Sequence, residues 1–302
     1  MTYLSVCSGI EAVSVAWEPL AFTPIGFAEI EKFPCELLKQ KYPNVKNYGD
    51  ITQYEKWNAG QFDILAGGTP CQSFSIAGKR GGTADERGAL MYAYLGIVET
   101  YRPRWVIWEN VPGVLSSNSG YDFASFLAGL EECGYGWAYR VLDAQYFGVP
   151  QRRRRVFVIG HSDNRADLAA EVLFKPESMC GNIATGSETQ KKTTAAIGKG
   201  VNYFRRGGNF KYHKDKKAAT LRSSASSDCF DLVLAREKRY IRRLTPLECE
   251  RLQGFPDNYT QIEWRGKTAE QCPDSLRYKA IGNSMAVPVM RWIGERIKRI
   301  KG

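Results

Sequence analysis

The feature that most constrains this chain is a short apolar run that ends at a cysteine. Phe62 to Ala66 has the length and composition of a buried strand, and the segment Gly67–Pro70 terminates it abruptly. Cys71 is therefore expected on a loop just beyond a strand end, where α/β enzymes place reactive groups. A cysteine taken alone is more often a small buried side chain, so other features must decide between the two interpretations.

Strands and helices alternate along the first 174 residues. Apolar runs at 2–7, 62–66, 103–110 and 156–160 alternate with helical patterns that end near Trp17 and Tyr42 and that cover 90–98 and 121–135. This alternation predicts an α/β fold built on a parallel doubly wound sheet. Periodicity fades from about residue 175 and returns at Tyr240. We therefore expect four segments, at 1–174, 175–239, 240–276 and 277–302.

Positive charge is concentrated in the second segment. The chain has 42 Lys and Arg against 32 Asp and Glu, a net charge of +10, and residues 175–240 alone hold fourteen basic and six acidic side chains. A run of charge is usually a solvated face, but this concentration fits a polyanionic partner. Aromatic residues among the charges predict a small folded module: Tyr203, Phe204, Phe210 and Tyr212.

Cysteine spacing and hydropathy argue against several classes of protein. The eight cysteines form no Cys-x-x-Cys pair and the chain has two histidines, so we expect neither a metal site nor a disulfide framework. No apolar run is long enough to cross a membrane, and the N-terminus lacks the pattern of a secretion signal. The sequence therefore predicts a cytoplasmic protein with free thiols.

The first strand leads into an incomplete nucleotide-binding turn. Gly9 follows the strand, and Glu29 stands twenty residues further on, where an acidic residue binds a ribose in such folds. Glu11 occupies the place of a second glycine, which argues against close backbone approach to a pyrophosphate. The pattern suits an adenosine cofactor without phosphate, such as S-adenosylmethionine. An ordinary strand-to-helix turn fits it equally well.

Two further strand boundaries carry polar groups. Glu109 and Asn110 end an apolar strand, where burial would raise the carboxyl pKa and let Glu109 act as an acid. Gln151 is followed by four arginines that run into a strand, and alternation along an extended chain would direct Arg153 and Arg155 to one side. Solvated side chains at both boundaries are the simpler interpretation.

These motifs, and the order in which they follow one another along the chain, resemble those of the cytosine-C5 DNA methyltransferases. The resemblance rests on six stretches, which are Gly67–Ser75, Arg87–Leu90, Glu109–Val111, Gln151–Arg155, Arg243–Pro256 and Gly282–Pro288, and on the pair Thr220-Leu221 in the basic segment. It implies a doubly wound mixed sheet of the S-adenosylmethionine-methyltransferase, Rossmann-like type. It also implies a catalytic domain at 1–174, a basic target-recognition domain at 175–239, a connecting segment at 240–276, and a C-terminal segment that completes the catalytic domain.

The resemblance further implies a reaction and a set of catalytic residues. The enzyme would transfer a methyl group from S-adenosylmethionine to C5 of a flipped-out cytosine in a specific sequence of double-stranded DNA, acting as a monomer without a metal. Cys71 would add to C6 of the base. Glu109 would protonate N3, Arg155 would bind the O2 oxygen, and Arg153 would orient Glu109.

Cofactor and DNA contacts also follow from the resemblance. The cofactor-binding set is Cys7, Gly9, Ile10, Glu11, Glu29, Ile30, Asp50, Ile51, Pro70, Leu90, Asn283 and Ser284. The DNA-binding set is Gln72, Ser75, Arg80, Arg205, Arg206, Lys211, Thr220, Leu221 and Arg222. The chain departs from the family at Cys7 and Glu11, where phenylalanine and glycine are usual, and at Ile30, where tryptophan is often found.

Three alternatives stay open. An RNA (tRNA) cytosine-C5 methyltransferase would share the fold, but Gln72-Ser73 after the cysteine and the separate basic segment favour DNA. A non-catalytic DNA-binding relative would be expected to lack Cys71, Glu109 or Arg155, and all are present. A nicotinamide dehydrogenase would use a similar first turn, but the missing glycines and the basic segment disfavour it.

Overall fold

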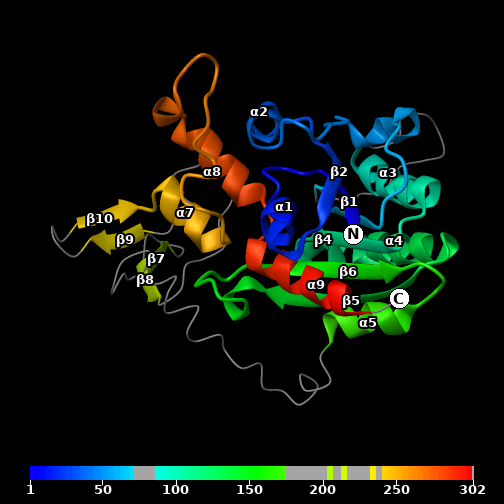
Figure 1. The fold of residues 1–302 in the computed structure, drawn as a ribbon. Helices are drawn as coiled ribbons and strands as arrows, with labels where there is room; N and C mark the ends of the chain where they lie inside the picture. Colours follow the sequence, from blue (N-terminus) through cyan, green and yellow to red (C-terminus); the bar gives the residue numbers. More distant parts are fainter. Residues whose placement is uncertain (71–85, 175–202, 207–211, 216–231, 236–239, 301–302) are drawn as a thin grey trace.

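A six-stranded sheet in the order β2-β1-β3-β4-β6-β5 organises the molecule (Figure 1). Its strands are β1 (Thr2–Val6), β2 (Thr23–Ala28), β3 (Ile64–Gly67), β4 (Trp105–Asn110), β5 (Gly136–Asp143) and β6 (Arg154–His161). The first four strands pair in parallel, whereas β6 is antiparallel to both β4 and β5. The doubly wound mixed sheet that the resemblance implies is therefore confirmed, whereas the wholly parallel sheet predicted from the alternation is wrong at β5 and β6, because β6 returns antiparallel to both of its neighbours. The computed structural model describes residues 1–70, 86–174, 203–206, 212–215, 232–235 and 240–300.

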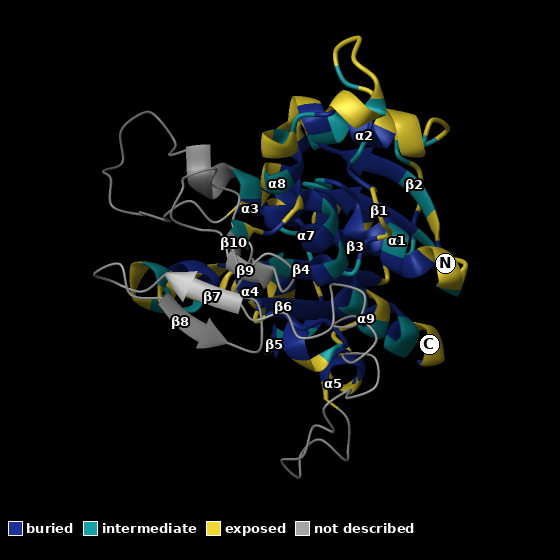
Figure 2. Ribbon diagram, turned by 90° about the vertical axis from the view of Figure 1, so that its left-hand side faces the viewer, coloured by how far each residue is buried: buried dark blue, intermediate teal, exposed yellow. Residues whose placement is uncertain are grey.

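Side chains that alternate along each strand build two cores, one on each face of the sheet. Tyr3 and Leu4 of β1 enter different cores, as do Ile107 and Trp108 of β4. The first core is covered by α1 (Ala12–Trp17), α5 (Ala166–Leu173) and α9 (Val287–Arg299), and the second by α3 (Glu86–Tyr101) and α4 (Tyr121–Glu132). Figure 2 shows the central strands almost wholly buried between these layers.

The C-terminal helices return to the same body. α9 packs along α1, and Trp17 Nε1 donates a hydrogen bond to the main-chain oxygen of Met290 at 2.8 Å. α8 (Asp274–Asn283), the helix that precedes α9, contacts α2 (Lys32–Lys41) from the N-terminal half of the chain. The N-terminal and C-terminal parts of the chain therefore fold as one unit.

The helix α7 (Pro246–Gln253) begins and ends where the sequence predicts. Thr245 and Glu248 form a reciprocal capping box, with Pro246 at the first helical position. Gly254 ends the helix in the left-handed conformation, with φ 82°.

A second sheet of four antiparallel strands lies beside the main body, on the left of Figure 1. Its order is β10-β9-β7-β8, from β7 (Tyr203–Arg206), β8 (Tyr212–Asp215), β9 (Leu232–Ala235) and β10 (Tyr240–Arg243). Three strands belong to the predicted recognition domain. The fourth, β10, begins just beyond the boundary predicted at residue 239, so the sheet crosses that boundary.

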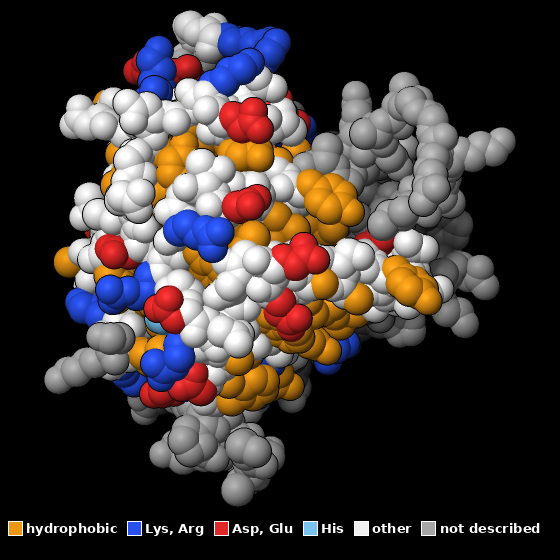
Figure 3. Space-filling view, turned by 90° about the vertical axis from the view of Figure 1, so that its right-hand side faces the viewer, with side chains coloured by type: hydrophobic (Ala, Val, Ile, Leu, Met, Phe, Trp, Pro, Cys, Tyr) orange, Lys and Arg blue, Asp and Glu red, His pale blue; other side chains and the backbone are white. Residues whose placement is uncertain are grey.

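The face drawn in Figure 3 has no large patch of a single charge among its described side chains. Acidic and basic side chains are interspersed on it, with apolar patches between them. Such a mixture gives no extended field of one sign on this face, as far as its described side chains are concerned. Among the helices of the described ranges, none has the length and apolar character needed to span a bilayer.

Candidate active site

A pocket lies at the carboxyl ends of β1, β3 and β4, where parallel strands place ligand sites. It joins four segments that are far apart in the sequence. Its lining residues are Ser5, Val6, Cys7, Ser8, Gly9, Ala12, Val13, Gly68, Glu109, Asn283, Ser284 and Met285. Five residues predicted for the cofactor or for catalysis therefore meet in one pocket: Cys7, Gly9, Glu109, Asn283 and Ser284.

Glu29 is held beside this pocket by backbone N–H groups. Its Oε2 accepts a hydrogen bond from Gly9 N at 2.7 Å, and its Oε1 accepts from Ile30 N at 2.9 Å and from Glu31 N at 2.8 Å. Asn47 fixes the backbone of Glu29 through both ends of its amide side chain. These hydrogen bonds fix the orientation of the Glu29 carboxylate.

The turn after β1 contains three residues with left-handed backbone angles, namely Cys7, Gly9 and Glu11. Burial raises the pKa of the Cys7 thiol to about 12, with Glu29 and Asp50 adding to the rise. Cys7 is therefore a neutral thiol at physiological pH and an unsuitable nucleophile.

Glu109 and Arg155 form an ion pair at the wall of the pocket. Arg155 Nε lies 3.0 Å from Glu109 Oε1, and both side chains are largely buried. Burial raises the pKa of Glu109 above its ordinary value, although the cations of Arg155 and Arg153 oppose the rise. The carboxyl group therefore holds its proton more strongly than an exposed glutamate does, which suits a proton donor.

Arg153 points to the C-terminal segment. Its Nη2 donates to Ser284 O at 2.5 Å and to Gly282 O at 3.2 Å. Burial and the nearby cation of Arg155 together lower the pKa of Arg153 to about 9, although Glu109 opposes the change. Arg153 therefore remains charged at neutral pH, influences Glu109 electrostatically, and fixes the end of α8.

The end of β4 also holds the segment that leads to Cys71. Asn110 Nδ2 donates to Thr69 O at 3.1 Å, and Trp108 Nε1 donates to Thr69 Oγ1 at 3.1 Å. Gly68 passes so close that a Cβ atom there would lie 2.7 Å from Glu109 O and 2.9 Å from Glu109 Oε2. Glycine therefore allows the strand-end loop to lie against the carboxyl group of Glu109.

Comparison with known proteins agrees with this geometry. The family model for C-5 cytosine-specific DNA methylase matches residues 1–299. This chain belongs to that family. The Type II methyltransferase M1.ScrFI of Lactococcus lactis subsp. cremoris is 29% identical to this chain, over 90% of this chain and 71% of the relative.

Two further relatives extend the comparison. A phage P1 protein named DNA N-6-adenine-methyltransferase is 35% identical over 464 residues, which cover 99% of this chain and 61% of the phage protein. The chain thus spans less than two thirds of the length of that relative. The structure of S. pombe Dnmt2 methyltransferase superposes with a TM-score of 0.66 and 16% identity, over 99% of this chain and 98% of the other. At that identity the likeness concerns the fold alone.

Several residues predicted for the cofactor site are absent from the pocket lining that the described residues form. Ile10 is fully buried in the first core, and Ile51 is buried in the second. Asp50 is exposed and caps a short 3-10 helix through Thr52 N. Ile30 is 69% exposed beside Glu29.

The remaining predicted residues fall into three groups. Pro70 is exposed and Leu90 is half-buried near the second core. Arg205 and Arg206 lie on β7. Eight predicted residues lie outside the described residues: Cys71, Gln72, Ser75, Arg80, Lys211, Thr220, Leu221 and Arg222.

Sequence reasoning missed several residues that shape the site. Ser5, Ser8, Gly68 and Met285 line the pocket, and Ser8 also joins β1 to β2 by accepting a hydrogen bond from Ala28 N at 3.1 Å. All four lie within two residues of a predicted site residue in the sequence, and this proximity is the signal that could have identified them. The sequence gives no comparable indication for Asn47, because only the fold brings its side chain to the backbone of Glu29.

Proposed function

We propose that this methylase transfers the methyl group of S-adenosylmethionine to C5 of cytosine in specific sequences of double-stranded DNA. One observation carries the proposal. Glu109, paired with Arg155, lines the same pocket as the turn at Cys7 and Gly9 and the C-terminal pair Asn283 and Ser284. A proton donor for the base therefore borders the cavity expected to hold the methyl donor.

The residues present fit S-adenosylmethionine. Glu29 Oε2 accepts one backbone hydrogen bond and so retains a lone pair for a ribose hydroxyl. Gly9 has open space where a Cβ would lie, which leaves room for a ligand against the turn. The cofactor would supply an electrophilic methyl group. Glu29 would orient the ribose, while Asn283 and Ser284 would form the opposite wall.

Cys71 and Glu109 would activate the cytosine ring together. The Cys71 thiolate would form a bond to C6, and Glu109 would deliver a proton to N3, so that the electron pair of the C5–C6 bond becomes available at C5. Arg155 would bind the O2 oxygen. After methyl transfer to C5, a base would take the C5 proton, the electron pair of that bond would re-form the C5–C6 double bond and expel the Cys71 thiolate, and the N3 proton would return to Glu109. The role of Cys71 rests on its motif, since it lies outside the described residues.

The basic segment would supply affinity for DNA. Residues 175–240 carry a surplus of eight positive charges, and phosphate contacts of this kind give salt-dependent binding. The reacting atoms lie inside the base stack, so the cytosine would be flipped out of the duplex. A substrate of this kind fits the cytoplasm of a bacterial cell or of a phage-infected host.

Labelled S-adenosylmethionine and nucleoside mass spectrometry test the proposal. The wild-type chain should produce 5-methylcytosine in duplex DNA, and Cys71→Ser should not. DNA that contains 5-fluorocytosine should trap a covalent complex with the wild-type chain, because the fluorine cannot leave as a proton. N6-methyladenine as the product, or methylation confined to tRNA, would show that the proposed substrate is wrong.

A further inference from the structure

The turn at the edge of the pocket contains a buried acid with an unusual backbone conformation. Glu11 has φ 60° and ψ 56°, in the left-handed region that favours glycine, and its side chain is fully buried. A non-glycine residue keeps such a conformation where the surrounding contacts hold it there. The contacts of Glu11 therefore indicate what fixes this turn.

Two hydroxyl groups bind the Glu11 carboxylate. Ser5 Oγ donates to Oε1 at 2.6 Å, and Ser14 Oγ donates to Oε2 at 2.5 Å. Ser5 belongs to β1 and Ser14 to α1, so the carboxylate joins the strand and the helix on either side of the turn. Tyr3 extends the network, because its hydroxyl lies 2.6 Å from Ser14 Oγ.

The same turn forms one wall of the pocket. Residues 7–9 line the pocket before Glu11, and Ala12 and Val13 line it after Glu11. Glu11 itself is not among the lining residues, so its carboxylate lies behind the wall. Glu11 was predicted as part of the cofactor-binding set, and the structure places its side chain behind the lining residues of the pocket.

We propose that Glu11 is a positioning residue for the cofactor: its carboxylate, held by Ser5 and Ser14, fixes the turn that forms one wall of the S-adenosylmethionine pocket. The inference rests on the proposed function, because it assigns this pocket to that cofactor. Glycine would adopt the left-handed conformation by its own backbone freedom. Here a side-chain tether holds the turn instead.

Binding of S-adenosylhomocysteine to the full chain, measured by titration calorimetry, tests the inference. Glu11→Gly relieves the backbone conformation but removes the tether, so we expect the dissociation constant to rise about tenfold or more, because two buried hydrogen bonds that fix the turn are lost. Glu11→Gln can still bond both hydroxyls and should bind almost as tightly as the wild type. Ser14→Ala removes one of the two donors and should weaken binding less than Glu11→Gly does.

A double variant and a matched control separate the tether from general effects. Ser14→Ala combined with Glu11→Gly should add nothing to the effect of Glu11→Gly, because the hydroxyl acts through the carboxylate. Ala21→Gly places glycine at another left-handed residue, with φ 58°, outside the pocket lining, and should leave the dissociation constant unchanged. Thermal unfolding should show that every variant is folded.

Steady-state kinetics add a second readout. Glu11→Gly should raise KM for S-adenosylmethionine and leave kcat at saturating cofactor close to that of the wild type. If folded Glu11→Gly binds S-adenosylhomocysteine as tightly as the wild type, the inference is wrong and the proposed function stands. If the wild type itself does not bind S-adenosylhomocysteine, the proposed function fails and the inference falls with it.

Discussion

Arg153 Nη2 donates a hydrogen bond to the main-chain oxygen of Ser284 at 2.5 Å, across 131 residues of sequence. The bond joins the arginine element before β6 to the C-terminal segment that lines the pocket. Gln253 Nε2 approaches the same oxygen at 3.4 Å and also donates to Ile281 O at 3.0 Å. The backbone around the end of α8 is therefore held from two other parts of the chain.

Removal of the Arg153 side chain should weaken both the fold and the cofactor site. Arg153→Met leaves the buried oxygens of Gly282 and Ser284 short of a donor, which should lower the free energy of unfolding by about 1–3 kcal/mol. Because Ser284 lines the pocket, S-adenosylhomocysteine should bind more weakly. Urea denaturation and calorimetry measure the two effects. Arg154→Ala, at an exposed neighbour, is the control and should change neither.

Replacement of Glu109 should stop catalysis and spare cofactor binding. Glu109→Gln cannot deliver a proton to N3, so kcat should fall about 10²- to 10⁴-fold, the usual range for a lost general acid. Wild-type activity should also fall at high pH, as the carboxyl with its raised pKa loses its proton. Unchanged kcat in Glu109→Gln would remove this residue from the mechanism.

A methyl group at Gly68 should disturb the site without unfolding the protein. In Gly68→Ala the added Cβ would meet Glu109 O at 2.7 Å, so the strand-end loop or Glu109 must move. Such a displacement should lower kcat about 10- to 100-fold. Gly113→Ala is the matched control, because its Cβ would meet Val111 at 3.9 Å, an ordinary contact. Equal activity of the two variants would contradict the prediction.

The free energy of unfolding should fall as the pH rises from the ordinary pKa of a glutamate to the raised pKa of Glu11. Burial raises the pKa of Glu11 from 4.5 to about 7, although hydrogen bonds from Ser14 and Ser5 oppose the rise. Between these values the folded protein keeps a proton that the unfolded chain releases. The stabilisation is therefore complete below pH 4.5 and is lost as the pH rises to about 7.

Comparison with Glu11→Gln isolates this contribution, because glutamine does not titrate. The wild type should lose up to about 3 kcal/mol of unfolding free energy relative to Glu11→Gln over this range. Urea denaturation of both proteins at about pH 5 and about pH 8 measures the difference. The nearby phenols do not titrate there, since burial raises the pKa of Tyr42 to about 12 and those of Tyr3 and Tyr259 well above their ordinary value. A pH-independent difference would contradict the prediction.

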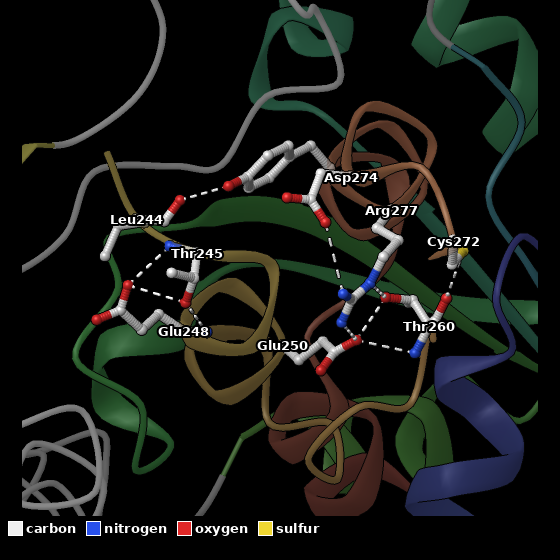
Figure 4. A network of polar contacts seen from close by, with 9 residues as sticks. Leu244, Thr245, Glu248, Glu250, Thr260, Cys272, Asp274 and Arg277 are labelled. Carbon is white, nitrogen blue, oxygen red and sulfur yellow. Dashed lines mark hydrogen bonds and ion pairs between the residues drawn. The ribbon is translucent and has the colours of Figure 1, made fainter. Parts of the chain in front are cut away.

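A buried ion pair joins α7 to α8 (Figure 4). Arg277 Nη2 lies 3.2 Å from Glu250 Oε1, and Arg277 Nε donates to Thr260 Oγ1 at 3.0 Å. Asp274 reaches Arg277 at 3.6 Å from the start of α8. The pair therefore fixes the beginning of α8, as Arg153 fixes its end.

Loss of one partner of this pair should be costly. Arg277→Met leaves the Glu250 carboxylate buried without its cation and should lower the unfolding free energy by about 3–5 kcal/mol. The double variant with Glu250→Leu should be more stable than Arg277→Met alone, because it removes the lone charge. Asp257→Ala breaks the more exposed pair with Arg251 and should cost less than about 1 kcal/mol. Urea denaturation ranks the variants, and equal losses would contradict the prediction.

Local chain chemistry made much of this fold predictable. The capping box at Thr245 and Glu248 sets the start of α7 through neighbours in the sequence, and the structure reproduces it. The alternation of strands and helices likewise predicted a doubly wound sheet, but a parallel one, and only the family resemblance implied a mixed sheet. The strand before Cys71 was placed slightly too early, at 62–66 instead of Ile64–Gly67, because glycine ends a strand less sharply than its propensity suggests.

The candidate site was predictable only in part. Motifs identified Glu109, Arg155 and Glu29, since each stands at a strand boundary with a recognisable spacing. The position of the Glu11 side chain behind the pocket wall was not predictable, because Ser5 and Ser14 reach its carboxylate only once β1 and α1 have packed. Arg153 was expected to orient Glu109, and its bonds to Gly282 and Ser284 could not be inferred from the arginine run.

The sequence by itself determined the family, the strand-helix alternation and the types of residue available for chemistry, because these depend on neighbours along the chain. Only the tertiary structure decided that β6 runs antiparallel to β4 and so places Arg155 opposite Glu109. It also decided that the C-terminal segment closes the pocket begun by the first turn. The physical reason is that the packing of two cores, one on each face of the sheet, fixes distances between residues that no local pattern relates.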